Sequence, residues 1–474
     1  MSFYGPSRSL PRPFRLVLTS FLHRPGLPFA DALSEESIQT AFEDEGARFG
    51  DDEDAVYTPA ITLWAFLSQV LYKGEHRSCV AAVARVVVLL VALEQEPCSG
   101  NTGAFCRARA TLPEKVIRKL AVDVSDGCER QVDGKWLWRG RHVYWADGTT
   151  VSMPDTPENQ AEYPQSSRQP EGLGFPIARV VVLLSLATGM LKDMAMGPYI
   201  GKETGETALL RQLLDGFDAG AILLADRYFC SYFMIALLIE RGVDFVTRVH
   251  QRRTVDFRRG RRLSQGDHLV TWTRPIKPAW MDQETYDRMP RSIEVREVEV
   301  HVDQPGFRTE SFVVVTTLTD AAIHTKDDIA ELYHCRWLAE LNIRAIKITM
   351  GMDILRCKTP RMVRKEMWMC LLAYNLIRRA MLQSATASGQ RPRHLSFAAA
   401  LQTVAAGWQV IVLSRDPFAA RLAEVELKNL AGYTIGDRPG RAEPRAVKRR
   451  PKPHDLLTQP RDKARAQLLK VKSS

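Results

Sequence analysis

Between Trp138 and Val249 the sequence alternates short apolar runs with helical patterns, and this alternation constrains the fold more than any other feature. Apolar and β-branched runs predict five strands, at 142–145, 178–186, 190–196, 221–224 and 243–249. Apolar residues at helical spacing predict helices at 205–216 and 232–241. The order of three strands, helix, strand, helix and strand therefore predicts an α/β fold.

The flanking segments differ in character from this α/β region. Residues 34–122 have helical periodicity, and 327–350 and 362–382 predict further helices. Residues 250–311 alternate apolar and polar positions, which predicts an inserted β-sheet, and a strand at 312–318 resumes the core. Beyond Gly436 the chain is rich in Pro, Lys and Arg, and we expect an extended or disordered tail.

The sequence therefore predicts five parts. They are an N-terminal helical domain (1–135), the first part of the α/β core (136–249), a β-rich insertion (250–311), the second part of the core (312–385), and a C-terminal helical region with a basic tail (386–474).

Two aspartates follow predicted strands of the core. Asp147 comes after the first strand and Asp226 after the fourth, an arrangement that matches an RNase H-like core. A single aspartate at such a place is often a turn former or a helix cap. Two on adjacent strands would lie close together, and a third carboxylate beside them would create a repulsion that divalent cations relieve.

A third carboxylate is available on the helix predicted at 327–350. Tyr333, Arg336, Glu340 and Lys347 fall within a stripe about 60° wide at 100° per residue. An ordinary solvated helix face would show the same pattern. A tyrosine and two cations around one carboxylate would also form a phosphate clamp beside a metal ligand.

Basic residues are clustered rather than spread evenly over a chain of net charge +10. Residues 251–262 contain six arginines, among them Arg252, Arg253, Arg258 and Arg259, and residues 441–474 contain eleven Lys or Arg against three acids. Such blocks are often solvated faces or tails. They also suit a polyanionic partner, because clustered cations bind phosphates and release counterions.

Several classes of protein are not indicated by the sequence. The apolar runs are too short for a membrane span, and no motif for nucleotide triphosphate, HExxH zinc site or GxSxG nucleophile occurs. The eight cysteines lack zinc-ligand spacing, so reduced core thiols in a cytoplasmic protein are expected.

Three motifs together resemble the signature of the insertion element four family of bacterial DDE transposases. YHCRWLAELNIRAIK has the family's spacing Tyr-x2-Arg-x3-Glu-x6-Lys, ADGTTV surrounds Asp147, and LLADRYF surrounds Asp226. The resemblance extends from about residue 50 to the basic segment PRAVKRRPKP at 444–453. It implies that Asp147, Asp226 and Glu340 ligate two divalent metal ions, Mg²⁺ or alternatively Mn²⁺.

The resemblance also implies roles in holding DNA. Tyr333, Arg336 and Lys347 would hold phosphates near the transposon end, and Trp337 matches an aromatic position of the signature. Phe312 stands where the family can place an aromatic that stacks on a flipped base, although the best-known relatives have Trp there. A phenylalanine buried in a strand would give the same sequence pattern.

The resemblance implies a transposase that binds terminal inverted repeats and catalyses metal-dependent cleavage and strand transfer. The expected route is cut-and-paste, with a hairpin on the transposon end as one variant. Expected partners are double-stranded transposon-end and target DNA and a second copy of the chain in a synaptic complex. No membrane and no nucleotide cofactor are expected, and DNA-bound protein would lie on the nucleoid. Two alternatives are a related RNase H-like nuclease and a transposase-derived regulatory protein without catalysis.

Overall fold

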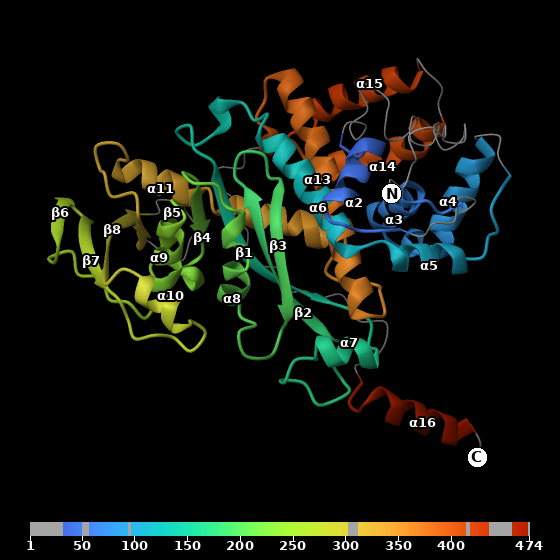
Figure 1. The fold of residues 1–474 in the computed structure, drawn as a ribbon, viewed down its shortest axis with the longest axis horizontal. Coiled ribbons are helices and arrows are strands. Elements are labelled where there is room, and N and C mark those ends of the chain that lie inside the picture. Colours follow the sequence, from blue (N-terminus) through green and yellow to red (C-terminus); the bar gives the residue numbers. More distant parts are fainter. Residues whose placement is uncertain are drawn as a thin grey trace.

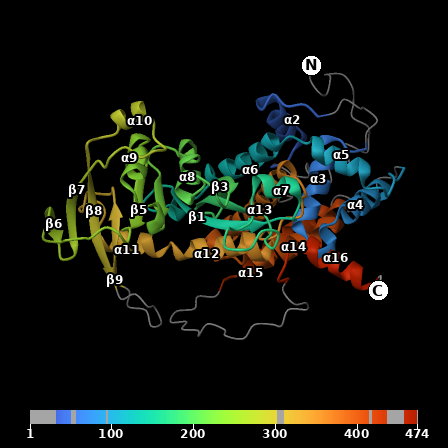
Figure 2. The same ribbon diagram turned by 90° about the horizontal axis from the view of Figure 1, so that it is seen from below.

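The computed structural model describes residues 32–49, 56–92, 96–301, 311–413, 418–435 and 457–472. Figure 1 shows a sheet that runs across the molecule, with strands β6–β8 at one end and most of the helices at the other. The N-terminal helices and the late helices α13–α15 gather at the same end, as Figure 2 also shows. Helices from the two ends of the described chain therefore lie together at one end of the sheet.

Nine strands of the described chain form one sheet, in the order β3-β2-β1-β4-β5-β9-β8-β7-β6. Their bounds are β1 Val143–Ser152, β2 Ile177–Ser185, β3 Leu191–Pro198, β4 Ile222–Ala225, β5 Asp244–Arg248, β6 Arg261–Ser264, β7 Asp267–Thr273, β8 Ser292–His301 and β9 Ser311–Thr316. β1 pairs antiparallel with β2 and parallel with β4, and β4 pairs parallel with β5. The strands at 250–311 extend this same sheet, because β9 pairs with both β5 and β8.

The longer helices up to residue 288 coincide with segments of helical periodicity, and several short helices were not predicted. The helices in this part of the described chain are α2 Glu35–Asp44, α3 Pro59–Leu71, η1 Gly74–Arg77, α4 Cys79–Ala92, α5 Gly103–Thr111, α6 Glu114–Glu129, η2 Gly134–Trp136, α7 Pro157–Glu162, α8 Glu206–Arg211, η3 Leu214–Gly216, η4 Arg227–Phe229, α9 Tyr232–Glu240 and α10 Gln283–Arg288. Short polar helices such as α7 and α10 carry no long apolar period, so the periodicity does not reveal them.

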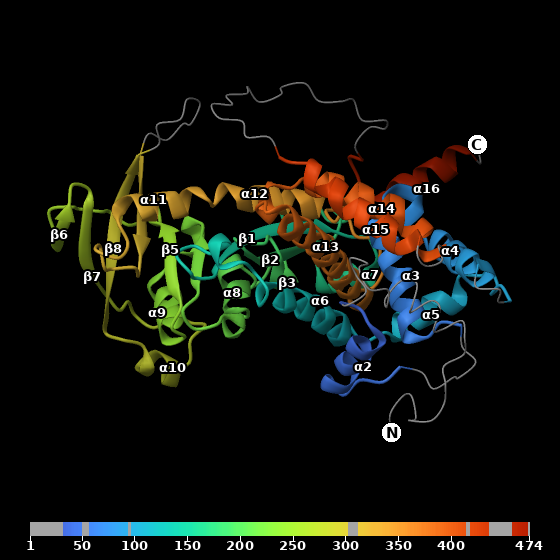
Figure 3. The same ribbon diagram turned by 90° about the horizontal axis from the view of Figure 1, so that it is seen from above.

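The later helices include α13, the long helix against which the other helices at this end of the molecule pack. They are α11 Lys326–His334, α12 Trp337–Arg344, the π-helix η5 Ala345–Thr349, α13 Pro360–Ser388, η6 Pro392–His394, α14 Phe397–Leu413, α15 Phe418–Gly432 and α16 Arg461–Lys472. The long α13 packs against α6, α3, α14 and α15, as Figure 3 shows. Its buried Asn375 bonds the backbone of Leu191 in β3 and of Ala121 in α6, which ties the helical end to the sheet.

The two faces of the sheet pack into two separate cores, because successive side chains of a strand point to opposite faces. In β1, Val143 and Trp145 join the core that includes α6, α13 and Tyr333, whereas Tyr144 and Ala146 join the core around α8 and α9. The same alternation holds in β4, where Leu224 and Ala225 lie in different cores. Asp147, the next residue of β1, is therefore directed toward the Tyr333 side, whereas Asp226 lies just beyond the end of β4.

Three details differ from the predictions. β1 does not end before Asp147 but continues to Ser152, because β2 pairs with it along its whole length. The helix predicted at 327–350 is divided into α11, α12 and η5, with turn residues at Cys335 and Arg336. The tail beyond Gly436 is helical at α16, where Arg461 lies near Asp155 and above the Phe175 ring.

Within the described ranges, none of the helices has both the length and the apolar character needed to cross a membrane. All eight cysteines are free thiols.

Candidate active site

Asp147 lies on β1, and Asp226 directly follows β4, the neighbouring parallel strand. The last paired residues of β1 and β4 are Ala146 and Ala225, and each is followed directly by one of the two aspartates. Asp147 accepts a hydrogen bond from the Gly148 amide at 2.8 Å, and Asp226 accepts one from the Arg227 amide at 2.7 Å. Both carboxylates keep oxygen lone pairs for a further ligand.

The charge of these carboxylates is the main electrostatic feature of the site. Burial raises the pKa of Asp147 to about 6, while the Gly148 amide and the Arg336 guanidinium act in the opposite direction. The negative charges of Glu206 and Asp226 raise the pKa of Asp147 further. Like charges held in a half-buried site favour a bound cation, which would lower the repulsion.

Tyr333 and Arg336 lie beside this pair of aspartates. Tyr333 is buried on α11, and burial together with the Asp226 charge raises its pKa to about 12, against the effect of Arg336. Arg336 is the N-cap residue of α12, and its charge acts on both Asp147 and Tyr333. The structure therefore brings together four of the residues singled out in the sequence.

The remaining residues of the Tyr-Arg-Glu-Lys pattern follow on α12 and η5. Glu340 and Trp337 belong to α12, a helix that packs against β1, but their side chains lie outside the described part of the structure. Lys347 is half-buried in the π-helix η5. A π-helix winds less per residue than an α-helix, so the angle expected for Lys347 on a regular helix does not apply.

Phe312 is close to the site but already has an aromatic partner. Its ring centroid lies 5.2 Å from that of Tyr333, and the Arg248 guanidinium lies 5.1 Å from its centroid. The residue is half-buried at the beginning of β9. Its position in a strand agrees with the sequence, and stacking on a base would compete with the contacts that Tyr333 and Arg248 make with the ring.

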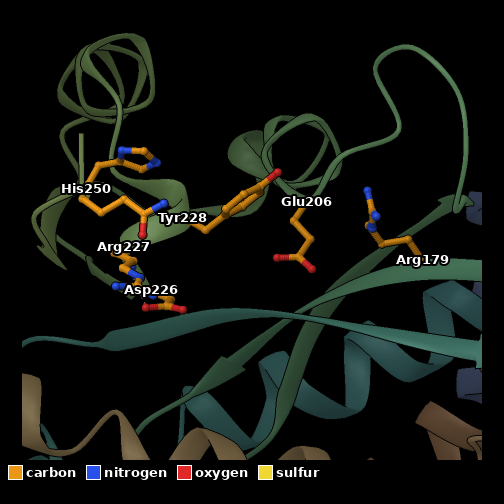
Figure 4. Close-up of a pocket in the computed structure, with 7 residues that line it drawn as sticks. Arg179, Glu206, Asp226, Arg227, Tyr228 and His250 are labelled. Carbon is orange, nitrogen blue, oxygen red and sulfur yellow. Dashed lines mark hydrogen bonds between the residues drawn. The ribbon is translucent and has the colours of Figure 1, made fainter. Parts of the chain in front are cut away.

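A cavity of about 340 Å³ opens beside Asp226. Figure 4 shows the side chains around it, with the carboxyl groups of Asp226 and Glu206 both directed toward the sheet. Its lining residues are Arg179, Glu206, Asp226, Arg227, Tyr228, His250 and Gln251. Of these residues, only Asp226 is predicted from the sequence, although Arg227 and Tyr228 follow it directly in the LLADRYF motif.

The predicted arginine cluster occupies the loop that leaves this cavity. Arg252 and Arg253 follow Gln251, and all four predicted arginines are exposed. Three of them have partners: Arg253 lies 3.5 Å from the ring centroid of Trp272 in β7, and Arg258 and Arg259 pair with Asp256 in the loop. The loop is therefore positively charged next to the carboxylates.

The donor atoms present suit a hard divalent cation, since Mg²⁺ prefers carboxylate oxygens. Within the described side chains, no three His, Cys, Asp or Glu residues are close enough together to hold a metal ion. Two adjacent carboxylates are available, one on β1 and one directly after β4, and a third ligand must come from another residue. The sequence predicts Glu340, on the helix packed against β1, as this third ligand.

Comparison with known proteins identifies the class. The family model described as "Transposase DDE domain" matches residues 138–376, half of the chain, a range that contains Asp147, Asp226 and Glu340. The chain therefore belongs to the DDE transposases, enzymes of DNA transposition.

Within that class, the chain falls in the IS4 family of insertion-sequence transposases. It is 27% identical over 364 residues to transposase InsG for insertion sequence element IS4 of Escherichia coli, an alignment that covers 73% of this chain and 76% of InsG. It is also 28% identical over 145 residues to the putative transposase InsZ of the same organism, covering 30% of this chain and 46% of InsZ. A cryo-EM structure of the piggyBac transposase synaptic complex with hairpin DNA gives a TM-score of 0.40 at 10% identity, covering 90% of this chain and 86% of that one.

Proposed function

We propose that this transposase binds the terminal inverted repeats of an insertion sequence and cuts and rejoins DNA with two divalent metal ions, Mg²⁺ or Mn²⁺. The observation that carries the proposal is the placement of Asp147 directly beside Asp226, with Tyr333 and Arg336 next to them. Glu340 would supply the third carboxylate from α12.

The residues of the site would divide the work between metal holding and DNA holding. Two metal ions supply activation of a water at one phosphate and stabilisation of the leaving oxygen. Asp147, Asp226 and Glu340 would fix the position of the reacting phosphate through those ions. Arg336 and Lys347 would hold neighbouring phosphates by charge-assisted hydrogen bonds.

Three aromatic residues would complete the grip on the transposon end. The Tyr333 hydroxyl would donate a hydrogen bond to a phosphate. Trp337 and Phe312 would lie along the DNA strand that carries this phosphate. Stacking on a base turned out of the duplex would relieve the strain of a hairpin end, which is the cut-and-paste variant we favour. Cleavage would take place in a synaptic complex of two copies with double-stranded DNA.

The architecture supports an RNase H-like core. In the order β3-β2-β1-β4-β5, three antiparallel strands are followed by two parallel ones, with one aspartate on β1 and one directly after β4. We propose that 136–249 and 312–385 form this core, that 250–311 is an insertion into it, that 1–135 binds DNA and that 386–474 is a C-terminal region with a basic tail.

Incubation of the purified protein with DNA that carries the element's own ends and with Mg²⁺ tests this function. We expect cleavage at the transposon ends, followed by joining of the freed 3′ end to target DNA, and no reaction with EDTA. Cleavage without joining would instead indicate a nuclease. Specific end binding without any cleavage in Mg²⁺ or Mn²⁺ would indicate a regulatory protein.

The arginine loop should contribute to DNA affinity through phosphates. We expect the double substitution Arg252→Ala and Arg259→Ala to weaken end binding and to reduce the slope of log affinity against log salt by about 0.9 for each phosphate that is no longer neutralised. A fluorescence anisotropy titration at several salt concentrations measures both. Arg288→Ala removes an exposed arginine that pairs with Glu240 on a different helix, and it serves as the matched control. An unchanged slope in the double variant would leave the loop with a role in solubility alone.

A further inference from the structure

Glu206 brings a further carboxylate to the site from the face of the sheet that α8 covers, which is opposite the Tyr333 side. It is the first residue of α8, whose Leu209 and Leu210 are buried in the core on that face. Gly148, the neighbour of Asp147, lies directly beneath the Glu206 side chain. A Cβ atom at Gly148 would be 2.2 Å from Glu206 Cδ. The absence of a side chain at residue 148 therefore makes the space that the Glu206 carboxyl group occupies.

The Glu206 carboxylate has none of the described residues as a hydrogen-bond or ion-pair partner. Arg179 is the cation whose charge acts on it. The Asp226 charge opposes its ionisation, and the Glu206 charge in turn acts on Asp147. A half-buried carboxylate beside two others is unfavourable unless a cation or its water shell compensates the charge.

We propose that Glu206 is a positioning residue that orients the water shell of a divalent ion held by Asp147 and Asp226. This inference rests on the proposed function, since it presupposes that ion. Direct coordination is not the arrangement that the described side chains support, because no three of them are close enough to share an ion. Mg²⁺ retains several of its waters in proteins, and Glu206 faces the cavity beside Asp226 in which those waters would lie.

Glu206→Gln in the full-length protein tests the proposal, because it keeps the shape of the side chain and removes the charge. We expect the affinity for Mn²⁺ to fall about 10- to 100-fold, as for other residues that act on a metal through its ligands. Calorimetry in the absence of DNA measures this affinity without any cleavage. The Mg²⁺ concentration for half-maximal cleavage should rise by a similar factor, and the cleavage rate at saturating Mg²⁺ should recover most of its wild-type value. Glu203→Gln, three residues earlier and paired with Arg211, is the matched control and should change neither quantity.

Gly148→Ala provides an independent variant. The added Cβ collides with the flexible end of the Glu206 side chain rather than with backbone, so the carboxyl group should be displaced and the metal requirement should rise as in Glu206→Gln. Because both changes act on one interaction, the double variant should be no worse than the more impaired single variant.

Two outcomes are distinguishable. If wild-type protein neither binds Mn²⁺ nor cleaves end DNA, the proposed function fails. If wild-type protein does both and Glu206→Gln retains its Mn²⁺ affinity and Mg²⁺ dependence, the role of Glu206 is overturned while the proposed function stands.

Discussion

We expect Glu340→Gln to abolish Mg²⁺-dependent cleavage of transposon-end DNA while end binding is retained. The substitution keeps the size of the side chain but removes the negative charge that a hard cation needs. The loss should exceed about 100-fold, the upper range for residues that act on a metal only through its ligands. Single-turnover cleavage of labelled end DNA, together with a binding titration on the same DNA, separates the two effects.

Lys347→Ala is the companion variant on the same helical segment. Its expected effect is weaker binding of the cleaved end and a smaller decrease in cleavage, because its role is to bind a phosphate. Since metal ligands act as a unit, Asp226→Asn should match Glu340→Gln, and combining Lys347→Ala with Glu340→Gln should lower cleavage no further. Near wild-type cleavage by Glu340→Gln would assign Glu340 to a solvated face and make the exposed Glu331 on α11 the next residue to test.

The second large effect concerns the stability of strands β6–β8. We expect Asp267→Ala to destabilise the protein by about 3–5 kcal/mol, because it leaves a buried arginine without its counter-charge. Asp267 and Arg296 are 3% and 1% exposed, and two hydrogen bonds of 2.7 and 2.8 Å join them across β7 and β8. A urea titration and limited proteolysis of residues 250–311 measure the loss globally and locally.

Asp256→Ala is the control for this effect. Asp256 also pairs with an arginine, Arg258, but that arginine is 91% exposed, and water screens exposed ion pairs. The urea midpoint should therefore be almost unchanged. If Asp267→Ala also left the midpoint and the protease pattern unchanged, the buried pair would not be what stabilises the outer strands.

Local sequence patterns predicted most strands and helices of the α/β region but not how strands pair at a distance. The strand predicted at 142–145 was too short because the apolar run is interrupted at Asp147 and by the threonines after it, whereas β1 continues to Ser152 through pairing with β2. The alternating pattern of 250–311 predicted strands, and β7 and β8 lie there. That they continue the core sheet through β9 depends on tertiary pairing, which no local pattern contains.

The candidate site shows the same division. Asp147 and Asp226 could be singled out because each follows an apolar run, and the register of β1 and β4 places them together. Glu206 could not be found in this way, since its position depends on the packing of α8 over Gly148. The angle predicted for Lys347 assumed one regular helix, and the turn at Cys335 and the π-helix η5 alter it.

The most direct test of a shared metal site is a crystal structure of the protein with transposon-end DNA and Mn²⁺, read from the anomalous scattering of the metal. We predict Mn²⁺ peaks between the carboxyl groups of Asp147, Asp226 and Glu340, about 3.5–4 Å apart where two ions are bound. A structure in which any one of these three carboxyl groups lies more than about 10 Å from the other two, beyond the reach of a shared two-metal site, would contradict it.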